Sequence, residues 1–197
     1  AALKVLVAET TRIVSMTITE GGYNLTESGE FNINAQFIQD DLKREQPQTV
    51  FGLIVKALSL RRAQGIAPFT VLSCDNLQNN GKTAQKAILS YSAAIDQSLS
   101  EWIAANVTFP CCMVDRITPA TLPQDRIALN TASGVDDAVP VFGEYFTQWV
   151  VEDSFCNGRP QLELVGVQFT ENVHPYEVQK LRMLYATHTM LAVPAFL

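Results

Sequence analysis

The residues whose types and spacing best suit chemistry lie on one predicted helix, at Lys180, Tyr185 and His188. At about 100° per residue, positions 185 and 188 lie on one face, one turn apart. Lys180 and His188 are separated by about 12 Å along the axis, so they cannot touch, but a long lysine side chain could share a cleft with the other two. A lysine among apolar neighbours can act as a general base. The alternative, that Lys180 and Arg182 are solvated helix residues, stays open.

Three polar clusters follow predicted strands. They are Glu20-Gly21-Gly22, Asp75-Asn76 and Asp115-Arg116. Open parallel sheets bind ligands beyond the carboxyl ends of their strands, so the three clusters together favour a shared site. Each cluster also has a structural explanation. The glycines can form a tight turn, Asn76 can satisfy its own loop, and Asp115 with Arg116 can form an ion pair or a helix cap.

Several common motifs are absent. The sequence has no GxGxxG or GxxxxGK[ST] loop for nucleotide phosphates and no GxSxG nucleophile elbow, which weighs against P-loop and hydrolase functions. The cysteines form no CxxC unit, and no pair of Cys or His has the spacing of zinc ligands. We therefore expect no metal site and interpret the cysteines as small buried hydrophobic residues. They are Cys74, Cys111, Cys112 and Cys156.

The composition is that of an acidic globular chain. Its 197 residues are 47% hydrophobic and 17% charged, with 14 basic against 20 acidic residues and a net charge of -6. This balance disfavours nucleic-acid binding, which needs clustered Lys and Arg. No apolar run approaches the roughly 18 residues of a membrane span, and the first residues do not resemble a signal peptide. We expect a cytoplasmic protein without nucleic-acid or membrane partners; its oligomeric state stays open.

The predicted strands are continuously apolar and alternate with helices, which is typical of βα units. The predicted fold class is therefore α/β with a mainly parallel sheet. The strands are residues 11–19, 68–74, 107–117, 145–151 and 162–169.

Three segments have helical patterns. One runs over residues 49–62, with Thr49 as its cap and Gly65 as its stop. A second covers residues 82–106 with a break around Asp96, and the third covers residues 174–192. The remaining segments are predicted to be loops: residues 23–48 with a short hairpin, residues 75–81, and a mostly irregular stretch over 119–140.

The two ends of the sequence are unusual for a complete protein. The chain begins without Met and stops in the apolar run 190–197, whereas natural termini usually end in polar residues. We therefore expect the chain to be part of a longer one.

Six motifs occur in a fixed order along the chain. They are TEGGY at 19–23, SCDN at 73–76, NVTFPCCMVDRITP at 106–119, QWVVEDSF at 148–155, GRPQLELVGVQF at 158–169 and PYEVQKLRMLYATH at 175–188. With these motifs the chain closely resembles the long-chain mannitol dehydrogenase family, from about residue 11 to residue 191. The family includes mannitol 2-dehydrogenase, arabinitol dehydrogenase, fructuronate reductase and tagaturonate reductase.

The resemblance implies a metal-independent oxidoreductase that uses NAD or NADP on a small polyol or sugar acid. Residues 1–170 would be the later part of a Rossmann-like nucleotide-binding domain, and residues 171–197 the start of a mostly helical substrate domain. The family's glycine-rich cofactor loop lies upstream of this chain, so its cofactor-binding residues stay unknown. The alternative is a non-catalytic fragment or subunit that retains the fold without binding a cofactor.

The resemblance also implies roles for four residues. Lys180 matches the family's general base, and Asn76 matches an asparagine that hydrogen-bonds the reacting oxygen and stabilises its charge. His188 matches the histidine that holds a substrate hydroxyl. Asp115 matches the aspartate of the VDR motif, for which we expect a positioning role.

One residue departs from the family pattern. The family has Asn five residues after the lysine, as a second donor to the reacting oxygen, whereas this chain has Tyr185. A tyrosine hydroxyl can donate one hydrogen bond to a substrate, but its ring is larger and reaches further. A different substrate pocket, impaired activity and an error in the sequence all stay open as explanations.

Overall fold

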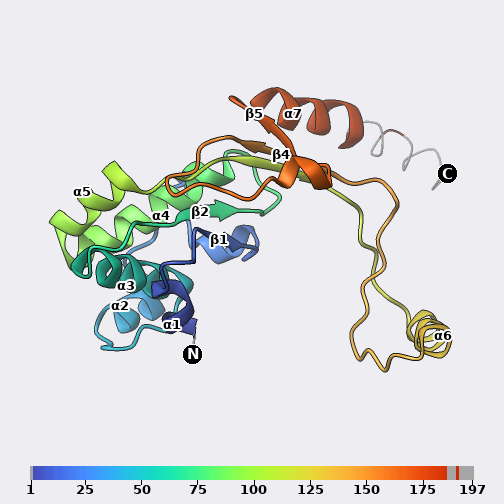
Figure 1. The fold of residues 1–197 in the computed structure, drawn as a ribbon, viewed down its shortest axis with the longest axis horizontal. Helices are drawn as coiled ribbons and strands as arrows, with labels where there is room; N and C mark the ends of the chain where they lie inside the picture. The colour runs from blue at the N-terminus through green and yellow to red at the C-terminus, as the bar shows by residue number, and fades with distance from the viewer. Residues whose placement is uncertain (1, 186–189, 191–197) are drawn as a thin grey trace.

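The computed structural model describes residues 2–185 and 190, without the side chains of residues 184 and 185. Five short strands form two sheets that lie next to each other at the centre of the molecule (Figure 1). The strands are β1 (Ile13–Met16), β2 (Thr70–Ser73), β3 (Cys112–Asp115), β4 (Gln148–Glu152) and β5 (Gln168–Thr170). The α-helices are α1 (Ala2–Val7), α2 (Gln36–Leu42), α3 (Val50–Ala63), α4 (Asn80–Ile95), α5 (Gln97–Asn106), α6 (Pro123–Ser133) and α7 (His174–Gln179).

The sheet pairing is mainly parallel, as predicted. Strand β1 pairs with β2 in parallel, and β4 pairs with β5 in parallel. The exception is the antiparallel pair of β3 and β4. The chain between these two strands leaves the sheet and returns to the same place without a crossover, so β4 runs against β3. The two sheets adjoin, because the Val71 amide donates to the Thr108 carbonyl, just before β3, at 3.1 Å.

The buried apolar residues are divided among separate clusters that pack on the two sheets. One large core lies between β1, β2 and helices α3 to α5 and includes Phe51, Leu58, Val71 and Ile88. Residues alternate between the two faces of the second sheet, as in any strand. The side chains of Cys112 and Val151 lie on one face of this sheet, which is covered by the segment around Phe155 and Leu162.

The opposite face of the second sheet positions α7. Its buried residues are Cys111, Met113, Val150 and Val173, and Tyr176 of α7 packs against them. Helix α7 therefore packs on the face formed by β3 and β4, and in Figure 1 it is the red helix at the top. The chain continues directly from α7 into a π-helix over Lys180–Tyr185.

Several predicted elements are confirmed. Helix α3 begins after Thr49, whose hydroxyl accepts a hydrogen bond from the Gly52 amide at 3.0 Å. The helix ends before Gly65, which has a φ of 68°. The predicted break at Asp96 separates α4 from α5, because the Asp96 carboxylate caps α5 by accepting from the Ser98 amide at 2.8 Å. The hairpin predicted within residues 23–48 corresponds to the bridge between Leu25 and Phe31.

Other predictions are wrong. Residues 119–140 contain α6, which begins with Pro123 in its first turn and ends at Gly134 with a φ of 70°. Those are ordinary signals for the start and stop of a helix. The predicted strand over 162–169 is a 3-10 helix (Leu162–Val165) followed by the short β5, because Gly166 takes a φ of 94° between them. Helices α1 and α2 were also not expected. The end of the predicted helix 174–192 lies outside the described residues.

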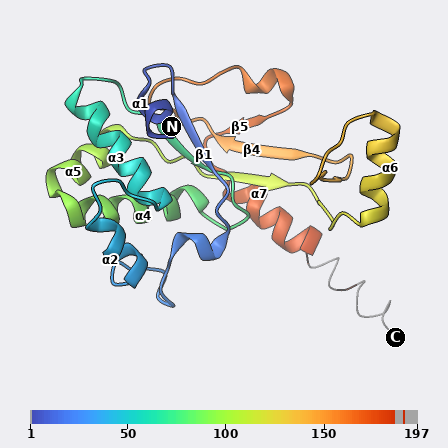
Figure 2. The ribbon, with the colours of Figure 1, turned by 90° about the horizontal axis from the view of Figure 1, so that it is seen from below.

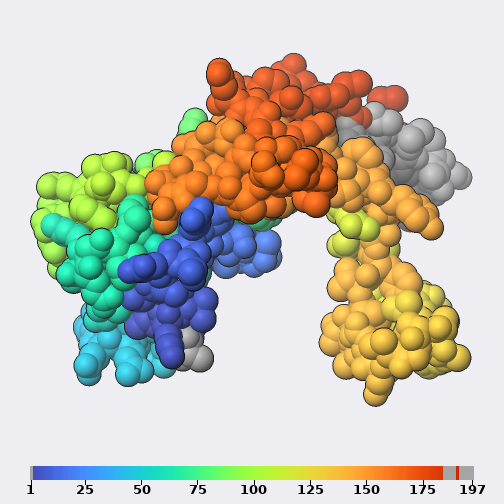
Figure 3. All heavy atoms as spheres, viewed as in Figure 1, coloured from blue at the N-terminus to red at the C-terminus, as the bar shows by residue number. Residues whose placement is uncertain are grey.

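Helix α6 and its two flanking segments form an arm that projects from the body. Both Figure 1 and Figure 2 show α6 at the far end from α3 and α5, and in Figure 3 the arm is clear of the body on the face shown. No residue of α6 is buried. At the base of the arm, Arg116 Nε donates to the Glu144 carbonyl at 3.1 Å and the Ile117 amide donates to Glu144 Oε1 at 2.7 Å. These contacts tie together the two segments that lead away from β3 and back to β4.

Gly81 allows α4 to approach β3 closely, which gives a test of this packing. A Cβ at Gly81 would lie 2.5 Å from the Pro110 carbonyl oxygen, and a backbone carbonyl cannot move aside cheaply. We expect Gly81→Ala to lower the free energy of unfolding by about 1–3 kcal/mol, as overpacking does, measured by denaturant unfolding. The matched control is Gly21→Ala, whose Cβ would meet nothing within 4 Å. Equal stability of the two variants would contradict this packing.

Candidate functional site

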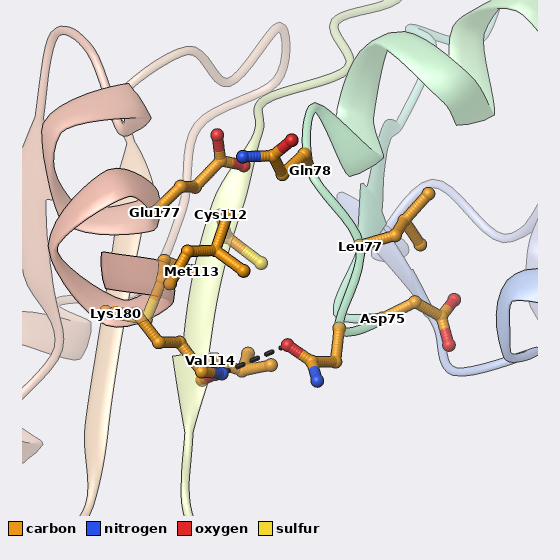
Figure 4. Close-up of a pocket in the computed structure, with 10 residues that line it drawn as sticks. Asp75, Leu77, Gln78, Cys112, Met113, Val114, Glu177 and Lys180 are labelled. Carbon is orange, nitrogen blue, oxygen red and sulfur yellow. Dashed lines mark hydrogen bonds between the residues drawn. The ribbon is translucent and has the colours of Figure 1, made fainter. Parts of the chain in front are cut away.

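The strand ends β2 and β3 and the last turn of α7 meet at Lys180. The Lys180 Nζ atom donates a hydrogen bond to Asn76 Oδ1 at 3.0 Å and another to the main-chain carbonyl of Val114. It also lies 3.7 Å from Asp115 Oδ1. Figure 4 shows Lys180 reaching from its helix to Val114, with the bond to the Asn76 amide dashed. The lysine predicted from the sequence therefore sits where two of the three predicted polar clusters converge.

Lys180 is not a solvated helix residue. Its side chain is only 9% exposed and that of Asp115 only 12%. An ion pair in such surroundings is less screened by water and salt than a surface pair. Arg182, the other cation considered for this face, is exposed. The alternative that both are solvated helix residues is therefore wrong for Lys180 and confirmed for Arg182.

Two cavities adjoin the contact between Lys180 and Asn76. One has a volume of about 210 Å³ and is lined by Asp75, Leu77, Met113 and Glu177, among others. The other has a volume of about 430 Å³ and includes Cys74, Ile117, Thr147 and Trp149 in its lining. Lys180, Asn76 and Val114 line both cavities. A group bound in either cavity would therefore reach the lysine and the amide at once.

The polar clusters predicted at the strand ends occupy different places in the structure. Asp115 pairs with Lys180, whereas Arg116 is exposed and binds at the base of the arm. The segment containing Glu20, Gly21 and Gly22 forms a 3-10 helix that ends in Tyr23. This segment does not line either of the two cavities, but Asp75 links it to the site. His188 and the side chain of Tyr185 lie outside what the structure describes.

Glu177 is a site residue that the sequence reasoning missed. It lies one helical turn before Lys180, lines the smaller cavity and is 5% exposed. Its Oε1 accepts from the Asn79 amide at 2.9 Å, and its Oε2, which is buried and has no hydrogen bond, lies 3.7 Å from His174 Nδ1. The spacing of three residues places Glu177 and Lys180 on the same helix face, so the sequence did contain a signal for it.

All four cysteines are free thiols. Cys111 and Cys112 are buried, as predicted, but Cys74 and Cys156 are only partly buried. A hydrogen bond with the Cys112 thiol, together with burial, raises the pKa of Cys74. Burial raises the pKa of Cys111 as well. Among residues 2–185 and 190 there is no group of three His, Cys, Asp or Glu residues that could hold a metal ion, and no helix long and apolar enough to cross a membrane.

The comparisons with known proteins identify the chain's relatives. Residues 2–164 match the family model of the mannitol dehydrogenase Rossmann domain. The chain belongs to this family. The resemblance inferred from the six motifs and the predicted Rossmann-like fold class are thereby confirmed.

Within the mannitol dehydrogenase family, the chain is 51% identical to the polyol:NADP oxidoreductase of Gluconobacter oxydans, with 100% of the chain and 41% of that protein covered. It superimposes on D-sorbitol dehydrogenase in substrate-free form with a TM-score of 0.96 at 51% identity, covering 100% of this chain and 41% of that one. For mannitol 2-dehydrogenase of Pseudomonas fluorescens in ternary complex with NAD and D-mannitol, the TM-score is 0.86 at 52% identity, covering 91% and 37%. The chain spans about two fifths of the length of these relatives.

Asn80, which is fully buried, joins the loop after β2 to the start of β3 beside the site. Its side chain donates to the carbonyls of Asp75 and Cys112 at 3.0 and 2.8 Å and accepts from the amides of Gly81 and Cys112 at 2.8 and 2.9 Å. We expect Asn80→Ala to lower the free energy of unfolding by about 3 kcal/mol, because it leaves these buried groups unpaired. Denaturant unfolding checks this. Asn106→Ala, on the exposed end of α5, is the control and should cost less than about 0.5 kcal/mol; similar losses in both variants would refute the expectation.

Proposed function

We propose that the protein carrying this chain is an oxidoreductase that transfers a hydride between NAD or NADP and a small polyol or sugar acid. It interconverts a secondary alcohol and the corresponding ketose or keto-sugar acid. Lys180 acts as the general base, in place of a metal ion. The observation that carries this proposal is the convergence of Asn76 Oδ1, Val114 O and Asp115 on one buried Lys180 Nζ beside two cavities.

The residues around Lys180 fit the reactive end of a nicotinamide cofactor and a polyol. The larger cavity has a volume of about 430 Å³, with Trp149, Val114 and Ile117 supplying apolar walls. Its polar groups include Asn76, Asp115 and Lys180, which contact one another through the lysine. Ligand sites are typically apolar cavities with a few convergent polar groups. NAD(P), when bound, supplies the hydride acceptor for alcohol oxidation and the donor for the reverse reaction.

Lys180 has the geometry of a positioned base. A neutral lysine amine keeps two N–H donors and one lone pair. Two acceptors are in place for those donors, Asn76 Oδ1 and Val114 O, and they fix the orientation of the nitrogen. In the proposed reaction, Nζ takes the proton of the substrate hydroxyl during oxidation and returns it to the alkoxide during reduction. Asp115, whose Oδ1 lies 3.7 Å from Nζ, keeps the side chain directed into the site.

Asn76 has two functions in this proposal. Its Oδ1 orients Lys180, and its Nδ2 is on the other side of the same amide, where it donates to the reacting oxygen of the substrate. We further propose that His188 holds a substrate hydroxyl and that Tyr185 stands where the family has a second amide donor. For the domains, we propose that residues 1–170 belong to the nucleotide-binding unit and residues 171–197 begin the substrate-binding unit. The end of the family match at residue 164 supports that boundary.

Lys180→Ala tests the base. In the protein expressed from its complete reading frame, we expect kcat to fall at least about 100-fold, the low end of a general base's contribution, with loss of the limb of the pH–rate profile that the base produces. Initial rates with NAD and NADP across a panel of polyols and sugar acids measure this. Lys86→Ala is the control, since Lys86 also forms an ion pair, with Glu30 at 3.0 Å, but is exposed on α4. Near-normal turnover by Lys180→Ala would remove Lys180 from the mechanism, and an inactive wild type would favour the non-catalytic alternative.

Asn76→Ala tests the donor. We expect kcat to fall about 10²- to 10³-fold with a smaller rise in KM, because a donor to the reacting oxygen acts mainly in the transition state. Asn76→Asp separates the two functions of the amide. It retains an acceptor for Lys180 but has no N–H to donate, so we expect it to be similarly impaired. A change in KM alone would show that Asn76 serves only in binding.

A further inference from the structure

Asp75 precedes Asn76 in the chain and lines the smaller cavity, but its carboxylate is not directed at Lys180. In Figure 4 its side chain points away from Lys180. The Asp75 carboxylate is buried and accepts hydrogen bonds from the Ile18 amide at 3.1 Å, the Thr19 amide at 2.7 Å and the Tyr23 hydroxyl at 2.6 Å. These donors belong to the segment that follows β1. One side chain therefore joins the chain after β1 to the chain after β2.

The backbone carbonyl of the same residue continues this link toward Lys180. It accepts from the Asn80 side chain, which also binds the main chain of Cys112 in β3. Two residues further along β3 is Val114, whose carbonyl accepts from Lys180. The chain after β1, the chain after β2 and the start of β3 are thus joined by two buried polar side chains, Asp75 and Asn80. Asn76 and Val114, the two acceptors of Lys180, are both held by this chain of contacts.

The backbone at Thr19 shows that this arrangement is not simply the relaxed form of the loop. Thr19 has a φ of 64°, a conformation that β-branched residues rarely adopt. Such a conformation persists only where the surroundings impose it. The hydrogen bond from the Thr19 amide to Asp75 Oδ1 is one of the contacts that hold it here, together with the bond from the Gly22 amide to the Thr19 carbonyl. A hydroxyl hydrogen bond from Tyr23, which also contacts Ser73 Oγ at 2.5 Å, holds the carboxylate from its other side.

The chain contains a second network of the same construction far from the site. The Asp41 carboxylate is buried and accepts from the amides of Gln48 and Thr49 and from the Tyr91 hydroxyl at 2.9 Å. Burial alone would raise the pKa of Asp41, but these hydrogen bonds lower it overall. Neither Asp41 nor Tyr91 lines the two cavities around Lys180. The Asp41 network therefore provides an internal control for the loss of stability that follows when a buried carboxylate is disturbed.

We propose that Asp75, held by Tyr23, is a positioning residue for the reaction. It fixes the loop that presents Asn76 to Lys180 and ties that loop to the segment after β1. This inference rests on the proposed function, since it assigns Asp75 an effect on turnover through Asn76 and Lys180. The alternative is that the network around Asp75 contributes only to folding, which is the role we expect for the network around Asp41.

The test compares matched variants in the protein expressed from its complete reading frame. Tyr23→Phe and Tyr91→Phe each remove one hydroxyl that donates to a buried carboxylate, so both should lower Tm by a similar amount, about 3–6 °C. We expect kcat of Tyr23→Phe to fall about tenfold, because small misplacements of reacting groups are costly, with KM changed less than about twofold. Tyr91→Phe should keep kcat within about twofold of the wild type. Deuterated substrate should give a larger primary isotope effect on kcat in Tyr23→Phe than in the wild type, as the hydride step becomes more rate-limiting.

Asp75→Asn and Asp41→Asn form a second pair with a stronger perturbation, and the tyrosine pair remains informative if either aspartate variant fails to fold. Equal changes in kcat for Tyr23→Phe and Tyr91→Phe, or a change confined to Tm, would overturn the positioning role while leaving the proposed function intact. Lys180→Ala is measured in parallel. A wild type without NAD(P)-dependent turnover, or a fully active Lys180→Ala, would instead contradict the proposed function and its mechanism, and with them the positioning role.

Discussion

Two oxygen atoms from different strand ends, Asn76 Oδ1 and Val114 O, bind the same nitrogen atom, Lys180 Nζ. The loop after β2, the end of β3 and the last turn of α7 must therefore all be in place before the lysine has its surroundings. Burying a cation is costly unless its donors are paired, so a shift in any of these elements would cost the Lys180 nitrogen a hydrogen bond. The alternation of β3 and β4 residues between two apolar faces places α7 on one face and thereby brings Lys180 to the strand ends. The packing of α7 on the second sheet therefore determines whether Lys180 reaches its two acceptors.

Much of this could be predicted from the sequence, and the failures have physical causes. Helix α3, the buried strand β2 and the break at Asp96 follow from local signals, a cap residue, a run of apolar residues and an aspartate that competes for backbone amides. Helix α6 carries equally clear end signals, but its apolar residues find no core within the described chain, so its pattern resembles an exposed irregular segment. The antiparallel direction of β4 depends on where the chain re-enters the sheet after the arm, and no local sequence pattern encodes that position.

The site residues divide in the same way. Lys180, Asn76 and Asp115 were proposed from motifs, and their convergence is a matter of distance across the fold. The function of Asp75 could not be derived from spacing, because its donors Ile18, Thr19 and Tyr23 are more than 50 residues away in the chain. Asn80 likewise resembles any turn residue until its contacts with Cys112 are known. Glu177 differs, since its position three residues before Lys180 was visible from the start.

The π-helix that begins at Lys180 changes which residues of that helix belong together. In an α-helix, residues five apart are about 140° apart around the axis, so position 185 would face away from the lysine. A π-helix closes its hydrogen bonds from residue i to i+5, which brings the fifth residue round to roughly one turn above the first. Over Lys180–Tyr185 the backbone is of this kind. The backbone of residue 185 therefore lies roughly one turn along from that of Lys180. The wider turn holds one residue more than an α-helical turn, so deleting one residue within 180–185 would leave an ordinary α-helical turn and remove the alignment of positions 180 and 185.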